Sequence, residues 1–224
     1  MARNFAVFVT VARPSAEFTS SASTCSLNPL KALNCALLLI QDFEFGEYPK
    51  DSRWTLITSK EALSEPPPAT VLPIPDISNK NAFASSSMAE INAFIRENED
   101  FMAKMGVSAA NWLVIDQKGL ESSTCLVCSQ ICNPGEDEER GEGEAGMTGE
   151  FRACRQPYEQ AWSMICNLDI AKLDFMDFVD VDAGQQEDGS WKWKSFKTKK
   201  EQETAEEAKR RAALKELRDG GFAD

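Results

Sequence analysis

Short apolar runs, separated by polar, glycine-rich or proline-rich stretches, predict the regular elements of this chain. Residues 5–11 form a run rich in valine and phenylalanine, and residues 36–40 and 112–116 form two further runs that are mostly apolar. Short continuous runs of this kind are typical of strands that are buried on both faces. We therefore expect a buried strand at each position, with residues 5–11 at an edge of the sheet.

Several helices are predicted from residues that favour helix starts and stops. Residues 53–63 precede three prolines and are predicted to be helical up to them. Ser87 and Glu90 match an S-x-x-E capping box, in which each side chain satisfies a backbone N–H group of the first turn. The helix that they begin carries an apolar stripe and ends at Gly106. Pro157 is predicted to begin another helix, because a proline at the first position costs no hydrogen bond.

Further strands complete the predicted sheet. A turn at residues 117–119 leads out of the strand at 112–116 into the next strand. The later predicted strands cover residues 123–128, 151–155 and 189–196. Because strands alternate with helices, we predict an α/β fold with a single mixed β-sheet and helices packed on its faces. An α+β arrangement is the alternative.

Composition divides the chain into three parts. Residues 1–35 hold the first strand and a connector rich in serine and threonine, and residues 36–196 form the compact domain. Within that domain, residues 133–150 are rich in glycine and acidic residues and are predicted to be a disordered insertion. Residues 197–224 are predicted to form a charged C-terminal helix and tail, with a capping box that begins at Thr204. This helix could project from the domain or lie across it.

Charge and composition exclude several classes of function. The chain has 224 residues, a formal net charge of −12 and no histidine. Nucleic acids and anionic membranes attract proteins with an excess of lysine and arginine, so neither is an expected partner. Without histidine, the Ser-His-Asp and Cys-His triads and every histidine-bound metal site are excluded. No apolar run is long enough to span a membrane.

The use of cysteine indicates the compartment. Seven cysteines, an odd number, lie at uneven spacing in a chain that is large enough to fold without disulfides. This pattern is typical of reduced thiols and predicts a cytoplasmic protein. Residues 15–26 are rich in serine and threonine and have basic flanks, so mitochondrial targeting is an alternative. Secretion directed by the apolar run at residues 5–12 is another.

One group of cysteines has a spacing that metal sites use. Cys125, Cys128 and Cys132 follow a C-x-x-C-x-x-x-C pattern, and Cys154 or Cys166 could add a fourth thiolate around a structural zinc ion. However, residues three apart in a strand point to opposite faces, and cysteine also packs as a small hydrophobe. Packing is therefore the preferred interpretation and zinc the alternative, and we expect no cofactor.

Carboxylates are the weak catalytic candidates, and two tryptophans are the candidate interaction residues. Asp42, Asp116 and Asp174 lie at predicted strand ends or helix starts, where α/β domains tend to hold ligands, and could serve acid–base catalysis. Asp174 is also a candidate helix cap. Trp191 and Trp193 share one face of the last predicted strand, with lysines on the other. Such a pair belongs either to the core or to a patch that binds a protein partner.

Residues 167–178 read N-L-D-I-A-K-L-D-F-M-D-F. They resemble the C-terminal signature of an uncharacterised domain family found in fungi and, in shorter form, in actinobacteria. Residues 37–43 are similar to the opening of that family, and residues 112–128 are similar to its fungal branch. The resemblance spans roughly residues 36–196. It implies a compact cytosolic α/β-type domain, and it implies no activity, ligand or catalytic residue.

These observations favour an intracellular, non-catalytic interaction or accessory protein. The reasons are the lack of an assembled catalytic set and the charged helix that follows a finished domain. A histidine-free enzyme of a fungal pathway that isomerises, cyclises or hydrolyses a small molecule is the second hypothesis, and a zinc-stabilised module is the third. A deep apolar pocket with converging carboxylates would favour the enzyme, whereas a filled core with a flat aromatic patch would favour the binder.

Overall fold

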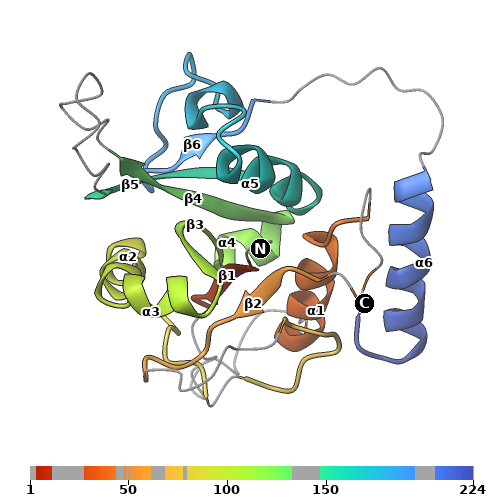
Figure 1. The fold of residues 1–224 in the computed structure, drawn as a ribbon. Helices are drawn as coiled ribbons and strands as arrows, with labels where there is room; N and C mark the ends of the chain where they lie inside the picture. The colour runs from red at the N-terminus through yellow and green to blue at the C-terminus, as the bar shows by residue number, and fades with distance from the viewer. Residues whose placement is uncertain are drawn as a thin grey trace, which may run out of the picture.

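The described strands of the protein build one sheet. A computed structural model describes residues 4–11, 28–43, 48, 50, 52–61, 69–77, 80–132, 147–194 and 205–223. Its strands are β1 (Asn4–Val9), β2 (Trp54–Leu56), β3 (Val107–Ile115), β4 (Thr124–Cys132), β5 (Met147–Pro157) and β6 (Trp191–Lys192). They lie in the order β2-β1-β3-β4-β5-β6 within one mixed sheet (Figure 1), which confirms the predicted α/β fold.

Helices cover both faces of this sheet. They are α1 (Pro29–Leu39), α2 (Met88–Glu97), α3 (Glu99–Lys104), α4 (Gln117–Ser122), α5 (Ala161–Asp169) and α6 (Ala205–Asp219), with short 3-10 turns η1 (Tyr158–Gln160) and η2 (Phe175–Phe178). On one face α1, α5, η1 and η2 enclose the larger core, and on the other face α2 and α3 enclose a second core. No helix in the described part of the chain is long and apolar enough to cross a membrane.

Alternation along β1 supplies both cores. Phe5, Val7 and Val9 point into the larger core, and Ala6 and Phe8 point into the second. A strand that is covered on both faces therefore reads as a continuous apolar run. β1 is a buried strand as predicted, but it lies between β2 and β3 and not at an edge of the sheet.

The neighbouring strands β2, β1 and β3 run parallel to one another. α1 leads from β1 to β2 on one face, and α2 and α3 lead from β2 to β3 on the other. The direction of the chain across the sheet thus reverses beside β1, and open α/β sheets hold ligands outside the carboxyl ends of strands at such a point. β4 and β5 continue the sheet in antiparallel pairs, and β6 is parallel to β5.

Residues 36–40, predicted as a strand, belong instead to α1 and its C-cap. The side chain of Asn28 accepts a hydrogen bond from a first-turn N–H at 3.0 Å, and Pro29 follows it, as is typical of helix starts. The run resembles a buried strand because this helix is covered on two sides. Leu37 points into the larger core, and Leu38 points into a third core beneath α6. A helix buried in this way loses its polar face, and periodicity alone cannot identify it.

The helix predicted over residues 53–63 is also wrong, because β2 occupies its start and residues 57–61 form no helix, while residues 62–63 lie outside the described part. Trp54 pairs with Phe5 of β1, and its indole N–H donates to the carbonyl oxygen of Ile40 at 2.8 Å. The ring is fully buried. These tertiary contacts outweigh the local helix propensity of the segment.

Several predicted boundaries shift in the structure. The boundary at residue 35 falls inside α1, so the first strand belongs to the sheet of the main domain. Residues 147–150 of the predicted insertion begin β5, and residues 133–146 lie outside the described part. The turn predicted at residues 117–119 is part of α4, and Pro157 ends β5 before the helical residues begin. Within the strand predicted at residues 189–196, β6 covers Trp191–Lys192 and Trp193 forms an isolated β-bridge, while residues 195–196 lie outside the described part.

The predicted capping box is confirmed. The Ser87 hydroxyl accepts a hydrogen bond from the Glu90 N–H at 3.2 Å, and the Glu90 carboxylate accepts one from the Ser87 N–H at 2.7 Å. The helix that follows is interrupted at Asn98, which separates α2 from α3. Gly106 comes just after α3 with φ at +69°, a conformation that favours glycine, and marks the predicted stop.

The charged helix α6 lies beside α1 at one side of the molecule (Figure 1). Leu217 of α6 and Ala223 after it join Leu38 and Phe43 in the third core, while most other side chains of α6 are exposed. Of the two predicted arrangements, the structure shows the helix packed on the domain. The predicted cap at Thr204 lies outside the described residues.

Replacement of Leu37 by alanine tests the burial of α1. Leu37 is fully buried against the sheet, so Leu37→Ala should lower the free energy of unfolding by about 2–5 kcal/mol. Leu173→Ala, at an exposed leucine, is the control and should change it by less than about 1 kcal/mol. Urea denaturation followed by circular dichroism measures both. Equal losses in the two variants would contradict the burial described here.

Candidate functional site

Polar side chains gather where β3 ends, at the carboxyl edge of the parallel strands. Asp116 directly follows β3 and is the N-cap of α4, and its Oδ1 accepts a hydrogen bond from the Gly119 N–H at 2.7 Å. This bond satisfies one of the N–H groups that a first helical turn leaves free. A Cβ atom on Gly119 would collide with the Thr124 carbonyl oxygen, so the tight turn from β3 to β4 requires glycine.

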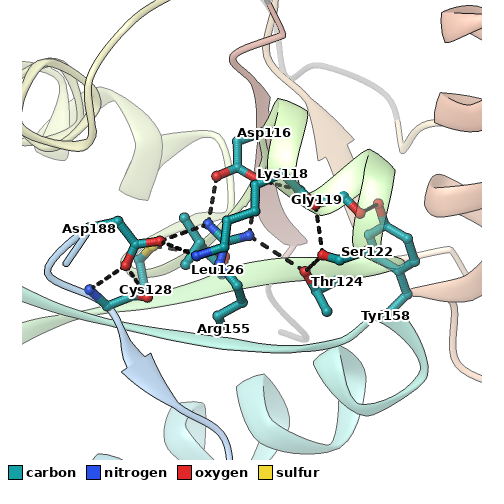
Figure 2. A network of polar contacts seen from close by, with 11 residues as sticks. Asp116, Lys118, Gly119, Ser122, Thr124, Leu126, Cys128, Arg155, Tyr158 and Asp188 are labelled. Atoms are coloured by element: carbon teal, nitrogen blue, oxygen red, sulfur yellow. Dashed lines mark hydrogen bonds and ion pairs between the residues drawn. The ribbon is translucent and has the colours of Figure 1, made fainter. Parts of the chain in front are cut away.

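Arg155 of β5 faces Asp116 and binds both of its carboxylate oxygens (Figure 2). Its Nη1 donates to Oδ1 at 3.0 Å, and its Nη2 donates to Oδ2 at 2.6 Å. The Arg155 side chain is only 11% exposed, and that of Asp116 is 25% exposed. Two parallel bonds between planar groups give the ion pair both strength and a fixed orientation.

Asp188, in the loop before β6, extends this pair into a larger network. Its Oδ2 accepts hydrogen bonds from Lys118 Nζ at 3.1 Å and from Arg155 Nη2 at 3.4 Å. Its Oδ1 accepts bonds from the hydroxyl and the N–H of Ser190, at 2.5 and 3.0 Å. We call Asp116, Lys118, Arg155 and Asp188 the charge network. It joins α4, β5 and the loop before β6.

Hydroxyl groups also hold α4 and the start of β4 in place through hydrogen bonds (Figure 2). The Tyr158 hydroxyl donates to the Gly119 carbonyl oxygen at 2.9 Å. The hydroxyl oxygens of Ser122 and Thr124 lie 2.8 Å apart, and Arg155 Nη1 lies 3.5 Å from that of Thr124. These bonds hold the connection between β3 and β4 on the body of the domain.

The charge network alters the acidity of its members. Partial burial acts to raise the pKa of Asp188, but the hydrogen bonds from Ser190 and Lys118 outweigh it and hold this pKa well below its usual range. Burial likewise acts to lower the pKa of Arg155, but the bonds to Asp116 outweigh it and raise this pKa. Burial raises the pKa of Tyr158. At neutral pH, Asp188 and Arg155 are therefore charged and the tyrosine is protonated.

The charged groups of this site bind one another and leave little capacity for a substrate. A general base needs a carboxylate that faces the proton it removes. Both oxygens of Asp116 instead accept hydrogen bonds from Arg155, and Oδ1 also accepts one from the Gly119 N–H. The geometry therefore supports a structural connection between β3, β5 and the loop before β6 more directly than proton transfer to a substrate.

The three carboxylates predicted as catalytic candidates lie in different parts of the fold. Asp42 follows α1, Asp116 follows β3, and Asp174 is the N-cap of η2 as predicted. The Asp174 N–H donates to the carboxylate of Asp177 at 2.9 Å, which completes that cap. The hydrogen bonds of Asp116 run to Arg155 and to the Gly119 N–H, and not to Asp42 or Asp174.

β4 separates two of the cysteines that the zinc hypothesis requires. Cys125 points into the larger core with Cys154, whereas Cys128 points into the second core on the opposite face, as strand alternation demands. The side chain of Cys132 lies outside the described part. Cys166 is half-buried in α5. Among the described residues, no group of three or more cysteines and acidic residues could hold a metal ion.

Burial keeps these thiols protonated. It raises the pKa of Cys125 and Cys128 far above the usual range, and raises the pKa of Cys154 and Cys166 to about 12. Each thiol therefore stays protonated at neutral pH, although a thiolate is the form that binds metals and attacks substrates. This state supports the packing interpretation.

Trp191 and Trp193 pack against the larger core and are half-buried. β6 pairs with β5 on one side, and on the other side the Asp180 N–H donates to the Lys192 carbonyl oxygen at 2.8 Å. Both edges of this short strand are thus occupied by the chain itself. The placement favours the core interpretation, and a role for the two rings in partner binding stays a prediction.

Sequence reasoning identifies Asp116 but misses Arg155, Lys118 and Asp188. Arg155 lies 39 residues from Asp116, and Asp188 lies 33 residues from Arg155, so no local pattern connects them. One feature of the sequence could have indicated that Arg155 has an acidic partner. An arginine within a strand that is expected to be buried needs a carboxylate nearby.

Loss of the Asp188 carboxylate should alter the pH dependence of stability. The folded-state pKa of Asp188 lies below its ordinary value of 3.8, so its stabilising contribution is complete above that value and is lost as the pH falls further. We expect the wild-type urea midpoint to fall as the pH drops from about 4 to about 2, and to fall less steeply in Asp188→Asn. Asp182→Asn, at an exposed carboxylate of the preceding turn, should follow the wild type. An unchanged slope in Asp188→Asn would contradict the network.

Removal of the Trp191 ring distinguishes core from surface. If the ring is part of the larger core, Trp191→Ala should lower the free energy of unfolding by about 2 kcal/mol, since part of its apolar area is already exposed. Trp191→Phe keeps most of the contact and should cost less. Thermal unfolding followed by circular dichroism measures both, and an unchanged melting temperature in Trp191→Ala would show that the ring serves another purpose.

Comparison with models of protein families, with curated proteins and with solved structures found no match. The resemblance of residues 167–178 to an uncharacterised fungal and actinobacterial family therefore stays a prediction. The contacts, burial and charges of the chain itself carry the functional proposal.

Proposed function

We propose that this chain is an intracellular, non-catalytic accessory protein that binds an acidic segment of a protein partner through the outward side of α6. The observation that carries the proposal is how α6 is attached. Its buried apolar contacts with the domain lie in the third core, a small cluster around Leu38, Phe43, Leu217 and Ala223. No described residue of α6 belongs to either of the two cores that cover the sheet, and the outward side of the helix is exposed.

Charge complementarity indicates the chemistry of the partner. α6 contains five basic and four acidic residues, whereas the whole chain has a formal net charge of −12. Arg211, Lys215 and Arg218 are all exposed on it. α6 thus has a net charge of +1 on an acidic protein, and its exposed lysine and arginine side chains favour a partner that presents aspartate and glutamate. Opposite charges steer the encounter and fix its orientation.

The rest of the domain supports a binding role over a catalytic one. The Asp116 carboxylate is bound by Arg155 on both oxygens. The thiols of Cys125 and Cys128 are buried on opposite faces of the sheet. These reactive groups stabilise the domain, and the domain in turn presents α6.

Charge reversal on α6 tests the proposal in the full-length chain. Arg211→Glu combined with Lys215→Glu should reduce recovery of a partner at least tenfold, because two attractive contacts become repulsive. The matched control combines Lys172→Glu with Lys192→Glu, the same charge change at exposed residues outside α6. Quantitative mass spectrometry compares the proteins recovered by the immobilised wild type and by both variants. The candidate partner is then purified and its affinity is measured directly at low and high salt.

Two results would overturn the proposal. One is a set of recovered proteins that does not differ between the α6 variant and its control. The other is a purified partner whose binding resists high salt, since contacts between exposed charges weaken as ionic strength rises. Circular dichroism of both variants shows that a loss of binding is not a loss of folding.

A further inference from the structure

A cavity of about 560 Å³ lies on the inward side of α6, where the helix meets the domain. Phe43, Tyr48 and Phe222 contribute aromatic rings to its wall, and Leu72 and Pro73 contribute aliphatic surface. From α6, the wall includes Lys209, Ala212, Ala213, Glu216 and Leu217. The third core therefore fills only part of the space between α6 and the domain.

The size and lining of this cavity suit a small flat molecule. Pockets that bind small molecules commonly have volumes of about 300–1,000 Å³ and are lined by apolar and aromatic side chains with a few polar groups. Aromatic rings contact one another best edge to face or in offset stacks. Phe43 and Tyr48 are already tilted at 42°, with ring centroids 6.1 Å apart. The aromatic ring of a ligand placed between this pair and Phe222 would contact aromatic side chains on two sides.

Two polar groups give the cavity a preference for anions. The Tyr48 oxygen accepts a hydrogen bond from the Leu72 N–H at 3.1 Å, which leaves the hydroxyl proton able to donate. Burial raises the pKa of Tyr48, so the hydroxyl stays protonated at neutral pH. Lys209 is exposed at the rim, and its ammonium group has no ion pair with another described residue. A carboxylate is the group that both donors would bind.

We propose that the cavity between α6 and the domain binds an aromatic carboxylic acid, with its ring against Phe43, Tyr48 and Phe222 and its carboxylate toward Lys209. Glu216, at the same rim, disfavours a second negative charge, so the cavity selects monoacids. This inference goes beyond the proposed partner binding, because it concerns the inward side of α6 and a different class of ligand.

Titration calorimetry with three naphthalene derivatives tests the inference on the full-length chain. Naphthoic acid should bind with a dissociation constant below about 1 mM, and naphthylmethanol about tenfold more weakly, because it lacks the charge that Lys209 attracts. Naphthylmethylamine should bind most weakly. Equal affinities for the acid, the alcohol and the amine would overturn the assigned ligand class, and the absence of saturable binding by all three would overturn the site.

Matched variants locate the binding. Ala212→Phe fills the cavity and should abolish binding of naphthoic acid, whereas Ala208→Phe, on an exposed part of α6 outside the cavity, should leave it unchanged. Lys209→Gln should bring the affinity for the acid down to that for the alcohol, while Lys172→Gln, at an exposed lysine outside α6, should preserve the difference. Binding that survives in Ala212→Phe would place the ligand elsewhere and overturn the proposal. Because partner binding is tested at Arg211 and Lys215, either proposal can fail without the other.

Discussion

A largely buried guanidinium must have a carboxylate beside it, and the centre of this fold is arranged around that requirement. Arg155 lies within β5, where only 11% of its side chain is exposed, and Asp116 provides the carboxylate from the end of β3. Since β4 lies between these two strands in the sheet, the pair reaches across it. Removal of either partner would leave an uncompensated charge, which is strongly destabilising. The same carboxylate begins α4, so the turn from β3 to β4 is fixed by the ion pair.

The parts of the fold that sequence could predict are those in which one local signal determines the structure. The capping box at Ser87 and the strand at residues 5–11 are such cases, because cap chemistry and β-branched composition act within a few residues. The segments at 36–40 and 53–63 are different. Their conformations depend on what covers them: α1 is buried by the sheet and by α6 together, and Trp54 is held by the carbonyl oxygen of Ile40. A short apolar run does not show whether it is a strand or a helix that is buried on more than one side.

The candidate site shows the same division between local and distant information. Strand alternation alone predicts that Cys125 and Cys128 point to opposite faces, and the structure places them in separate cores. The position of Asp116 after a buried strand is also visible in the sequence. Its partner is not, because the register between β4 and β5 brings Arg155 to it across 39 residues. Only the physical rule that buried charges are paired would have suggested a search for that partner.

Helix α1 connects the charged C-terminal helix to the rest of the molecule. Leu37 packs into the larger core and the adjacent Leu38 packs under α6, so one turn of helix belongs to two cores. Arg210 adds a second attachment, since its guanidinium lies 5.3 Å from the centre of the Phe43 ring. Because Phe43 also lines the cavity, a molecule bound there would contact the residue that holds α6 in place. Occupation of the inward side of α6 would in this way stabilise the helix that presents its basic outward side, and the two proposed binding events would be coupled with positive sign.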